Sequence, residues 1–404
     1  MTASEQLAQF AAGSKALPKL CREYKKERAT VHLKELVGGA LSFYAAAAVA
    51  KTGGVHIFVA EDRDAAAYLL NDFYNLLDEK QVYFFPSSYK RSAAYGAEDA
   101  QGVVQRTTAM NAVRGFTKGY LVVCTYPEAL AERVVDAATL QRDTIAVKLG
   151  DKISIAVLED ALADANFTRV DFVYEPGQYS VRGGIVDVFS YSESKPYRID
   201  FFGDEVDSIR RFNISSQLSA DKLDRVEIVP NLNAGEAPRV SFVQFAGSSA
   251  TCWFYDADYV LRRVNDLRRK VLADMEEPGQ IDRLLTSRNV LLRDMAGNSV
   301  VALRDNLPER PATAAVVFDT APQPKFNKNF EMLADDMIRN SLRGYATYIL
   351  SENKVQVERL ENIFHQIGRG QAAVRSLSVT LHEGFVDNDL KLCLYTCLLY
   401  TSPS

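Results

Sequence analysis

The segment from Phe172 to Phe212 constrains the fold of this chain more than any other stretch of its sequence. Short apolar runs alternate there with turn residues, among them Gly183-Gly184 and Gly203-Asp204. A period of two is typical of a strand with one buried face, and glycine at the first position of a hairpin loop favours a type II′ turn. The segment therefore predicts a three-stranded antiparallel meander, with strands at Gly184–Ser190, Tyr197–Phe202 and Val206–Phe212.

The middle strand of this meander separates two kinds of side chain. Ile199 and Phe201 fall on one face, and both are typical of a core. Arg198, Asp200 and Phe202 fall on the other face. Aromatic and arginine side chains are enriched where proteins bind one another. The alternation therefore predicts a protein-binding face, although packing of Phe202 under a neighbouring loop explains the same pattern equally well.

A third candidate, Arg182, comes from the strand that precedes Gly184. Hairpin formation about Ser192–Lys195 brings that strand alongside the middle one, so we expect Arg182 to lie near Phe202. The candidate partner-binding residues are therefore Arg182, Arg198 and Phe202.

The first third of the chain alternates helix-like with strand-like stretches. Strands that recur with helices between them indicate a parallel sheet with right-handed crossovers, which is the architecture of an α/β domain. The predicted strands are Val55–Ala60, Val82–Phe85 and Leu121–Thr125, and the predicted helices are Leu36–Ala50, Ala65–Leu77 and Val103–Val113.

Changes in this pattern divide the chain into domains. Short strands replace the alternation near Asp143, long helices return after Pro230, and prolines between Pro308 and Pro324 mark a further boundary. The predicted α/β domain has two parts, residues 1–143 and 229–324, which are separated by an antiparallel α+β insert at 144–228. A small α/β domain follows at 325–394, and residues 395–404 form a truncated or non-native tail. We expect the chain to be the front section of a longer protein, because it stops soon after Leu390–Leu394 without a closing helix.

The stretch Leu36–Phe43 lies where an α/β domain carries a phosphate loop, which needs glycines and a lysine to hold phosphates. The sequence contains no Gly-Lys dipeptide, and Lys51 follows the helix instead of opening it. We therefore expect no ATP hydrolysis by this domain and no catalytic residues. Asp204–Asp207 resembles an acidic Mg²⁺ motif, but a hairpin turn is a poor place for one. The scattered histidines also predict no metal site.

The composition favours a soluble cytoplasmic protein. The formal charge is −5, and the five cysteines have no paired spacing, as in reduced proteins. No apolar run approaches the length needed to span a bilayer, about 20 residues. The basic cluster Arg262–Lys270 lies on a predicted helix, where a solvated face is a commoner outcome than nucleic-acid contact.

Two blocks of the central segment carry a resemblance to a known family: YEPGQYSVRGGIVDVF and YRIDFFGDEVDSIRRF. They resemble the interaction domain shared by UvrB and the bacterial transcription-repair coupling factors. Two earlier segments of this chain resemble the first part of the same module: VYFFPSSYKRSAAYGAEDAQGVVQRTTAMNAV and, after it, LVVCTYPEAL. The missing lysine favours the coupling factors over UvrB. So does the interval Phe85–Gln105, which leaves no room for the DNA-inserting hairpin of UvrB.

This resemblance implies a fold and a function. It implies a degenerate helicase-like (P-loop NTPase-like) domain, split by a UvrB-type interaction domain and followed by a small α/β domain. It implies that the chain recruits UvrA in transcription-coupled nucleotide-excision repair, with Arg182, Arg198 and Phe202 as the contacting residues. ATP, Mg²⁺, RNA polymerase and double-stranded DNA are implied for parts of the parent protein beyond residue 404. A fragment of a UvrB-like damage-verifying ATPase is the alternative.

Overall fold

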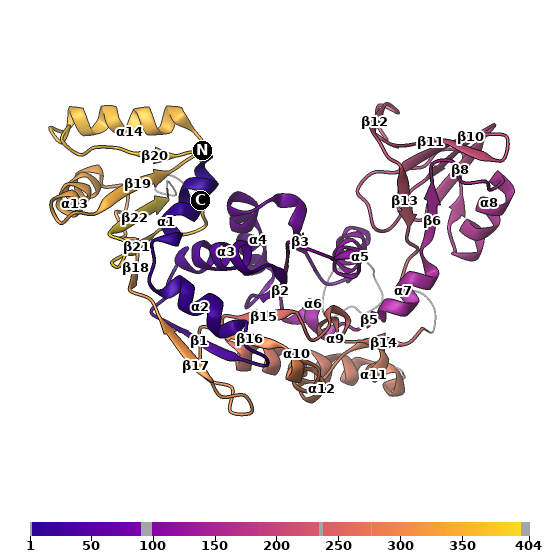
Figure 1. The fold of residues 1–404 in the computed structure, drawn as a ribbon, viewed down its shortest axis with the longest axis horizontal. Coiled ribbons are helices and arrows are strands. Elements are labelled where there is room, and N and C mark those ends of the chain that lie inside the picture. Colours follow the sequence, from indigo (N-terminus) through magenta and orange to yellow (C-terminus); the bar gives the residue numbers. More distant parts are fainter. Residues whose placement is uncertain (1, 90–98, 234–236, 276, 397–404) are drawn as a thin grey trace.

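The structure, a computed structural model, describes residues 2–89, 99–233, 237–275 and 277–396. A parallel sheet lies in the middle of the molecule, the residues 145–229 stand at one end, and the region after residue 320 stands at the other (Figure 1). None of the described helices combines the length and the apolar character that crossing a membrane requires.

The central sheet contains seven strands in the order β17-β1-β16-β15-β2-β4-β3, and all of its ladders are parallel. Its strands are β1 (Thr30–Lys34), β2 (Gly54–Val59), β3 (Val82–Phe84), β4 (Tyr120–Thr125), β15 (Thr251–Phe254), β16 (Ser299–Ala302) and β17 (Ala314–Val317). The predicted parallel sheet is thus confirmed. Strands from before and after the 145–229 segment belong to this one sheet, so that segment is an insertion into it.

Helices cover both faces of the sheet, and each face has its own hydrophobic cluster. The first cluster joins the sheet to α1 (Ala3–Ala12), α2 (Ala16–Tyr24), α3 (Ala40–Thr52) and α4 (Arg63–Leu76). The second joins it to α5 (Ala100–Gly115), α6 (Pro127–Ala131), α9 (Phe242–Ala246), α10 (Ala257–Asp274) and α12 (Arg288–Asp294). Helix α3 begins at Ala40 and not at the predicted Leu36, because Gly38 has φ of 56°, which an α-helix does not contain.

The insertion is built on an antiparallel sheet in the order β12-β11-β10-β9-β8-β7, in which only β7 and β8 run parallel. Its strands are β7 (Thr168–Arg169), β8 (Gln178–Arg182), β9 (Ile185–Val188), β10 (Tyr197–Phe202), β11 (Glu205–Phe212) and β12 (Ser219–Lys222). Strands β9 to β11 are the predicted meander. Gly203 has φ of 62° in the loop between Phe202 and Glu205, as a type II′ turn requires. Leu158 and Leu162 of α8 (Ile155–Asp164) pack on the core of this sheet.

The two ends of the insertion lie side by side, because β6 (Ile145–Lys148) pairs antiparallel with β13 (Arg225–Ile228). Val147, Val226 and Ile228 of this pair belong to the hydrophobic core of the insertion. The insertion therefore begins and ends in one two-stranded ribbon that packs on the inserted sheet (Figure 1).

The last region contains a five-stranded sheet flanked by α13 (Phe330–Leu342) and α14 (Lys354–Gln366). Its strands are β18 (Thr320–Pro322), β19 (Ala346–Leu350), β20 (Ser376–Leu377), β21 (Phe385–Asp387) and β22 (Leu392–Thr396). Strand β22 thus includes Tyr395 and Thr396, which the sequence analysis assigned to the tail. The remainder of that tail, with Cys397, lies outside the described residues, and the other four cysteines are buried and unpaired.

Candidate protein-docking site

Strand β9 lies between β8 and β10, so the strand of Arg182 is not directly beside the middle strand, contrary to the expectation from the sequence. The register across β9 still places the two candidate arginines on one face. Asp187 of β9 lies directly opposite Ser180 of β8 and Arg198 of β10. Arg182 is two residues beyond Ser180 on β8, so its side chain points to the same face. This face is the one opposite the hydrophobic core, which contains Val186.

Asp187 joins the two arginines through hydrogen bonds. Arg198 donates from Nε to Oδ1 at 2.7 Å and from Nη2 to Oδ2 at 2.9 Å. Arg182 donates from Nη2 to Oδ2 at 2.5 Å. Asp187 is only 1% exposed, so these are charge-assisted bonds in a place of low dielectric, and they raise the pKa of Arg198. Asp187 is a site residue that the sequence did not predict, although a carboxylate between two strand valines is a signal for one.

The two arginines differ in their exposure to solvent. The Arg198 side chain is 15% exposed, lies over the Phe212 ring at 4.3 Å from its centroid, and donates from Nη2 to Gln217 Oε1 at 3.1 Å. The Arg182 side chain is 38% exposed, and its guanidinium lies 4.8 Å from the centroid of the half-exposed Phe172 ring. Arg198 is therefore less exposed than strand alternation alone suggests, because Gln217 covers part of its guanidinium.

Phe202 is 84% exposed at the end of β10. Of the two alternatives left open for Phe202, packing under a neighbouring loop is therefore wrong. The Phe201 N–H donates to Gly184 O at 2.7 Å, which places Phe202 beside the turn that follows Arg182. An irregularity in the ladder between Asp200 and Phe201 interrupts the strict alternation on which the face assignment of Phe202 depended.

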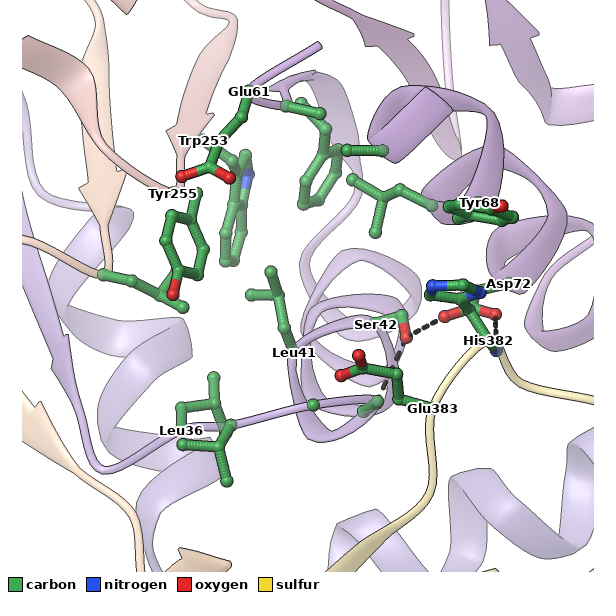
Figure 2. Close-up of a pocket in the computed structure, with 18 of the residues that line it drawn as sticks. Leu36, Leu41, Ser42, Glu61, Tyr68, Asp72, Trp253, Tyr255, His382 and Glu383 are labelled. Carbon is green, nitrogen blue, oxygen red and sulfur yellow. Dashed lines mark hydrogen bonds between the residues drawn. The ribbon is translucent and has the colours of Figure 1, made fainter. Parts of the chain in front are cut away.

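A separate cavity of about 400 Å³ lies beside Leu36–Phe43, the stretch in which a phosphate loop would lie. It opens at the carboxyl ends of β2 and β15, which is the usual place for ligands in open α/β sheets. Figure 2 shows aromatic and acidic side chains around it. These are Tyr68, Trp253, Tyr255, Glu61, Asp72 and Glu383. The described wall of the cavity contains neither lysine nor arginine, so its charge is unsuited to phosphate.

His382 and Glu383 of the last region pack against the turn at Gly39 that leads into α3 beside this cavity. A Cβ atom on Gly39 would lie 2.1 Å from the Glu383 carbonyl oxygen, so the two backbones are in close contact. Asp72 accepts hydrogen bonds from Ser42 Oγ at 2.6 Å and from the His382 N–H at 2.7 Å, both drawn in Figure 2. The His382 ring stacks on Tyr68 with centroids 3.7 Å apart. Burial raises the pKa of Asp72 from 3.8 to about 6.

The predicted basic helix corresponds to α10, and its arginines form ion pairs with carboxylates. The pairs are Arg262–Asp258, Arg263–Glu128, Arg268–Asp282 and Arg269–Asp266. Much of the positive charge is thus compensated, which favours the solvated helix face over a nucleic-acid patch.

Two further expectations concern metal binding and the UvrB hairpin. Within the described residues, no group of His, Cys, Asp or Glu side chains is arranged to hold a metal ion. The interval Phe85–Gln105, which separated this chain from UvrB, includes residues 90–98, which lie outside the described residues.

Comparison with known proteins identifies the inserted segment. Residues 145–233 match the family model of the UvrB interaction domain. This segment is similar to the UvrB interaction domain. The match covers the whole antiparallel sheet and therefore Arg182, Asp187, Arg198 and Phe202.

The chain is similar to the transcription-repair-coupling factors of several bacteria. It is 27% identical to those of Bacillus subtilis and Escherichia coli over 199 residues, which is 49% of this chain and 17% of each relative. It is 35% identical to that of Haemophilus influenzae over 101 residues, which is 25% of this chain and 9% of that relative. The predicted resemblance to the N-terminal region of these factors is thus confirmed, although the matched part is less than a fifth of each relative's length.

Proposed function

We propose that this chain recruits the excision-repair protein UvrA through the exposed face of its UvrB interaction domain. The observation that carries the proposal is the arrangement of two arginines on the buried carboxylate of Asp187, beside the 84% exposed Phe202. A phenylalanine so exposed gains free energy only when a partner covers it. Arg182 would donate charge-assisted hydrogen bonds to carboxylate or carbonyl groups around it, and Arg198 would contribute its positive charge and hold the shared Asp187.

The cellular role follows from the relatives whose names refer to the coupling of transcription and repair. We infer that the chain works within such a factor, bringing UvrA to stalled transcription complexes in the cytoplasm. RNA polymerase and double-stranded DNA would be bound by the part of the relatives that this chain does not span. The central sheet would be a helicase-like domain of the P-loop NTPase type that has lost its phosphate site.

We further propose that this chain binds no nucleotide and hydrolyses no ATP. Phosphate binding requires convergent N–H groups and cations. Support comes from the carboxylates of Glu61, Asp72 and Glu383 around the cavity, and from the Glu383 carbonyl packed against Gly39. Isothermal titration of the whole chain with ATP and Mg²⁺ should release no binding heat. Saturable binding would overturn this part and favour the UvrB-like ATPase.

The docking proposal is tested by binding of purified UvrA to the whole chain. We expect the wild-type chain to bind and the Arg182→Ala/Phe202→Ala double variant to lose most of its affinity, by about thirtyfold or more. A useful control is Leu342→Ala, because Leu342 is 85% exposed on α13 in the last region. Undiminished binding by the double variant would exclude this face as the docking site.

A further inference from the structure

The charges on the docking face do not add up to a strongly positive patch. Arg182 and Arg198 supply two positive charges, and Asp187, which bonds to both, removes one. The neighbouring Arg210 is paired with Asp200 on the same face. A partner therefore meets about one uncompensated positive charge.

The hydrogen-bonding groups of the two arginines are also unequally available. Arg198 directs Nε and Nη2 to Asp187, and it directs Nη1 and Nη2 to the carbonyl and side chain of Gln217. Arg182 uses Nη2 for Asp187, and its guanidinium is stacked near Phe172. Within the described residues, its remaining N–H groups have no hydrogen-bond partner, so they are available to a partner protein.

We infer that Asp187 is a positioning residue for partner binding: it holds Arg182 and Arg198 in one fixed geometry and makes the face a directed hydrogen-bond donor of low net charge. The inference rests on the proposed docking function. Without Asp187, both guanidinium groups would lose their shared acceptor and each would have to be ordered when the partner binds, which costs affinity. The preferred partner surface presents a carboxylate or carbonyl group next to an apolar socket for Phe202.

Asp187→Asn is the direct test, because it keeps the shape of the side chain and removes its charge. We expect the affinity of the whole chain for UvrA to fall by about tenfold. We also expect its salt dependence to become steeper, because two uncompensated arginines replace one net charge. If Asp187 served only the stability of the domain, a folded Asp187→Asn variant would bind UvrA with wild-type affinity.

Asp207→Asn on β11 is the matched control, because it makes the same change in net charge. Asp207 is exposed and, within the described residues, forms no ion pair. We expect wild-type affinity and a wild-type salt dependence from this variant. An equal loss of affinity in the two variants would mean that net charge alone matters, and it would overturn the inference.

A measurement on the wild-type chain keeps the test valid if Asp187→Asn fails to fold. A docking face with one net charge should lose only about threefold in affinity between 50 and 200 mM salt. A steep loss would overturn the inference. If the wild-type chain does not bind UvrA at all, the proposed function fails; if wild type and a folded Asp187→Asn bind equally well, only the role of Asp187 fails.

Discussion

Arg198 donates two parallel hydrogen bonds to Asp187, from Nε to Oδ1 at 2.7 Å and from Nη2 to Oδ2 at 2.9 Å. Only a guanidinium offers two such donors in a fixed plane, so lysine could not replace it. The pair lies on the solvent side of a sheet whose other side is the domain core. It therefore connects the stability of the inserted domain with the geometry of the proposed docking face.

The two arginines should differ in their effect on stability. Arg198→Ala leaves the buried Asp187 with a single partner and exposes the Phe212 ring, so we expect the free energy of unfolding to fall by about 2–3 kcal/mol. Arg182→Ala removes a more exposed partner and should cost less than about 1 kcal/mol. Urea unfolding of the whole chain, followed by circular dichroism, compares them. Equal losses would contradict the assignment of Arg198 as the inner of the two arginines.

Phe202→Ala should separate binding from folding. The side chain is so exposed that its removal should change the free energy of unfolding by less than about 0.5 kcal/mol. If Phe202 is the apolar anchor, binding to UvrA should weaken by about 2 kcal/mol or more. Thermal unfolding and titration with UvrA measure the two effects. A loss of stability without a loss of affinity would reverse this interpretation.

Asp72→Asn should stabilise the chain at neutral pH. The pKa of Asp72 is raised from 3.8 to about 6, mainly by burial, so the folded state favours its protonated form. The stability that Asp72 contributes is complete below its unfolded pKa of 3.8 and is lost as pH rises through about 6. The asparagine stays neutral, so its advantage over wild type should appear between these pH values and reach up to about 3 kcal/mol.

Urea unfolding between pH 3.5 and 8 measures this advantage of Asp72→Asn over wild type. Asp207→Asn serves as the control, because it removes the charge of an exposed carboxylate instead of a buried one. An advantage for Asp72→Asn that is the same at every pH would show that charge burial is not its cause.

Gly39→Ala should loosen the packing of His382 and Glu383 on the turn that leads into α3. Gly39 has φ of −63° and ψ of −7°, which alanine adopts freely, so any effect comes from the new Cβ against the Glu383 carbonyl. We expect a cost of about 1–3 kcal/mol and faster hydrogen exchange of the His382 amide. Gly115→Ala is the control, because its Cβ would meet no atom within 4 Å. Unchanged exchange at His382 would show that the contact is loose.

Most elements of the fold could be predicted because they depend on local patterns. Strands β2, β3, β4 and β9 to β11 follow from apolar periodicity and turn residues. Strand β1 and helices α1 and α2 were not predicted. The strand TVHLK has weak alternation, and burial against neighbouring elements makes it a strand of the sheet.

The sequence by itself determined the candidates for the proposed docking face, since glycine turns and a period of two already selected Arg182, Arg198 and Phe202. Only the tertiary structure decided how these side chains are arranged. It placed Asp187 between the arginines, covered Arg198 with the Gln217 loop and left Phe202 in solvent. The physical reason is that alternation is a property of one strand, whereas partners and burial depend on the register between strands and on the loops that cover them.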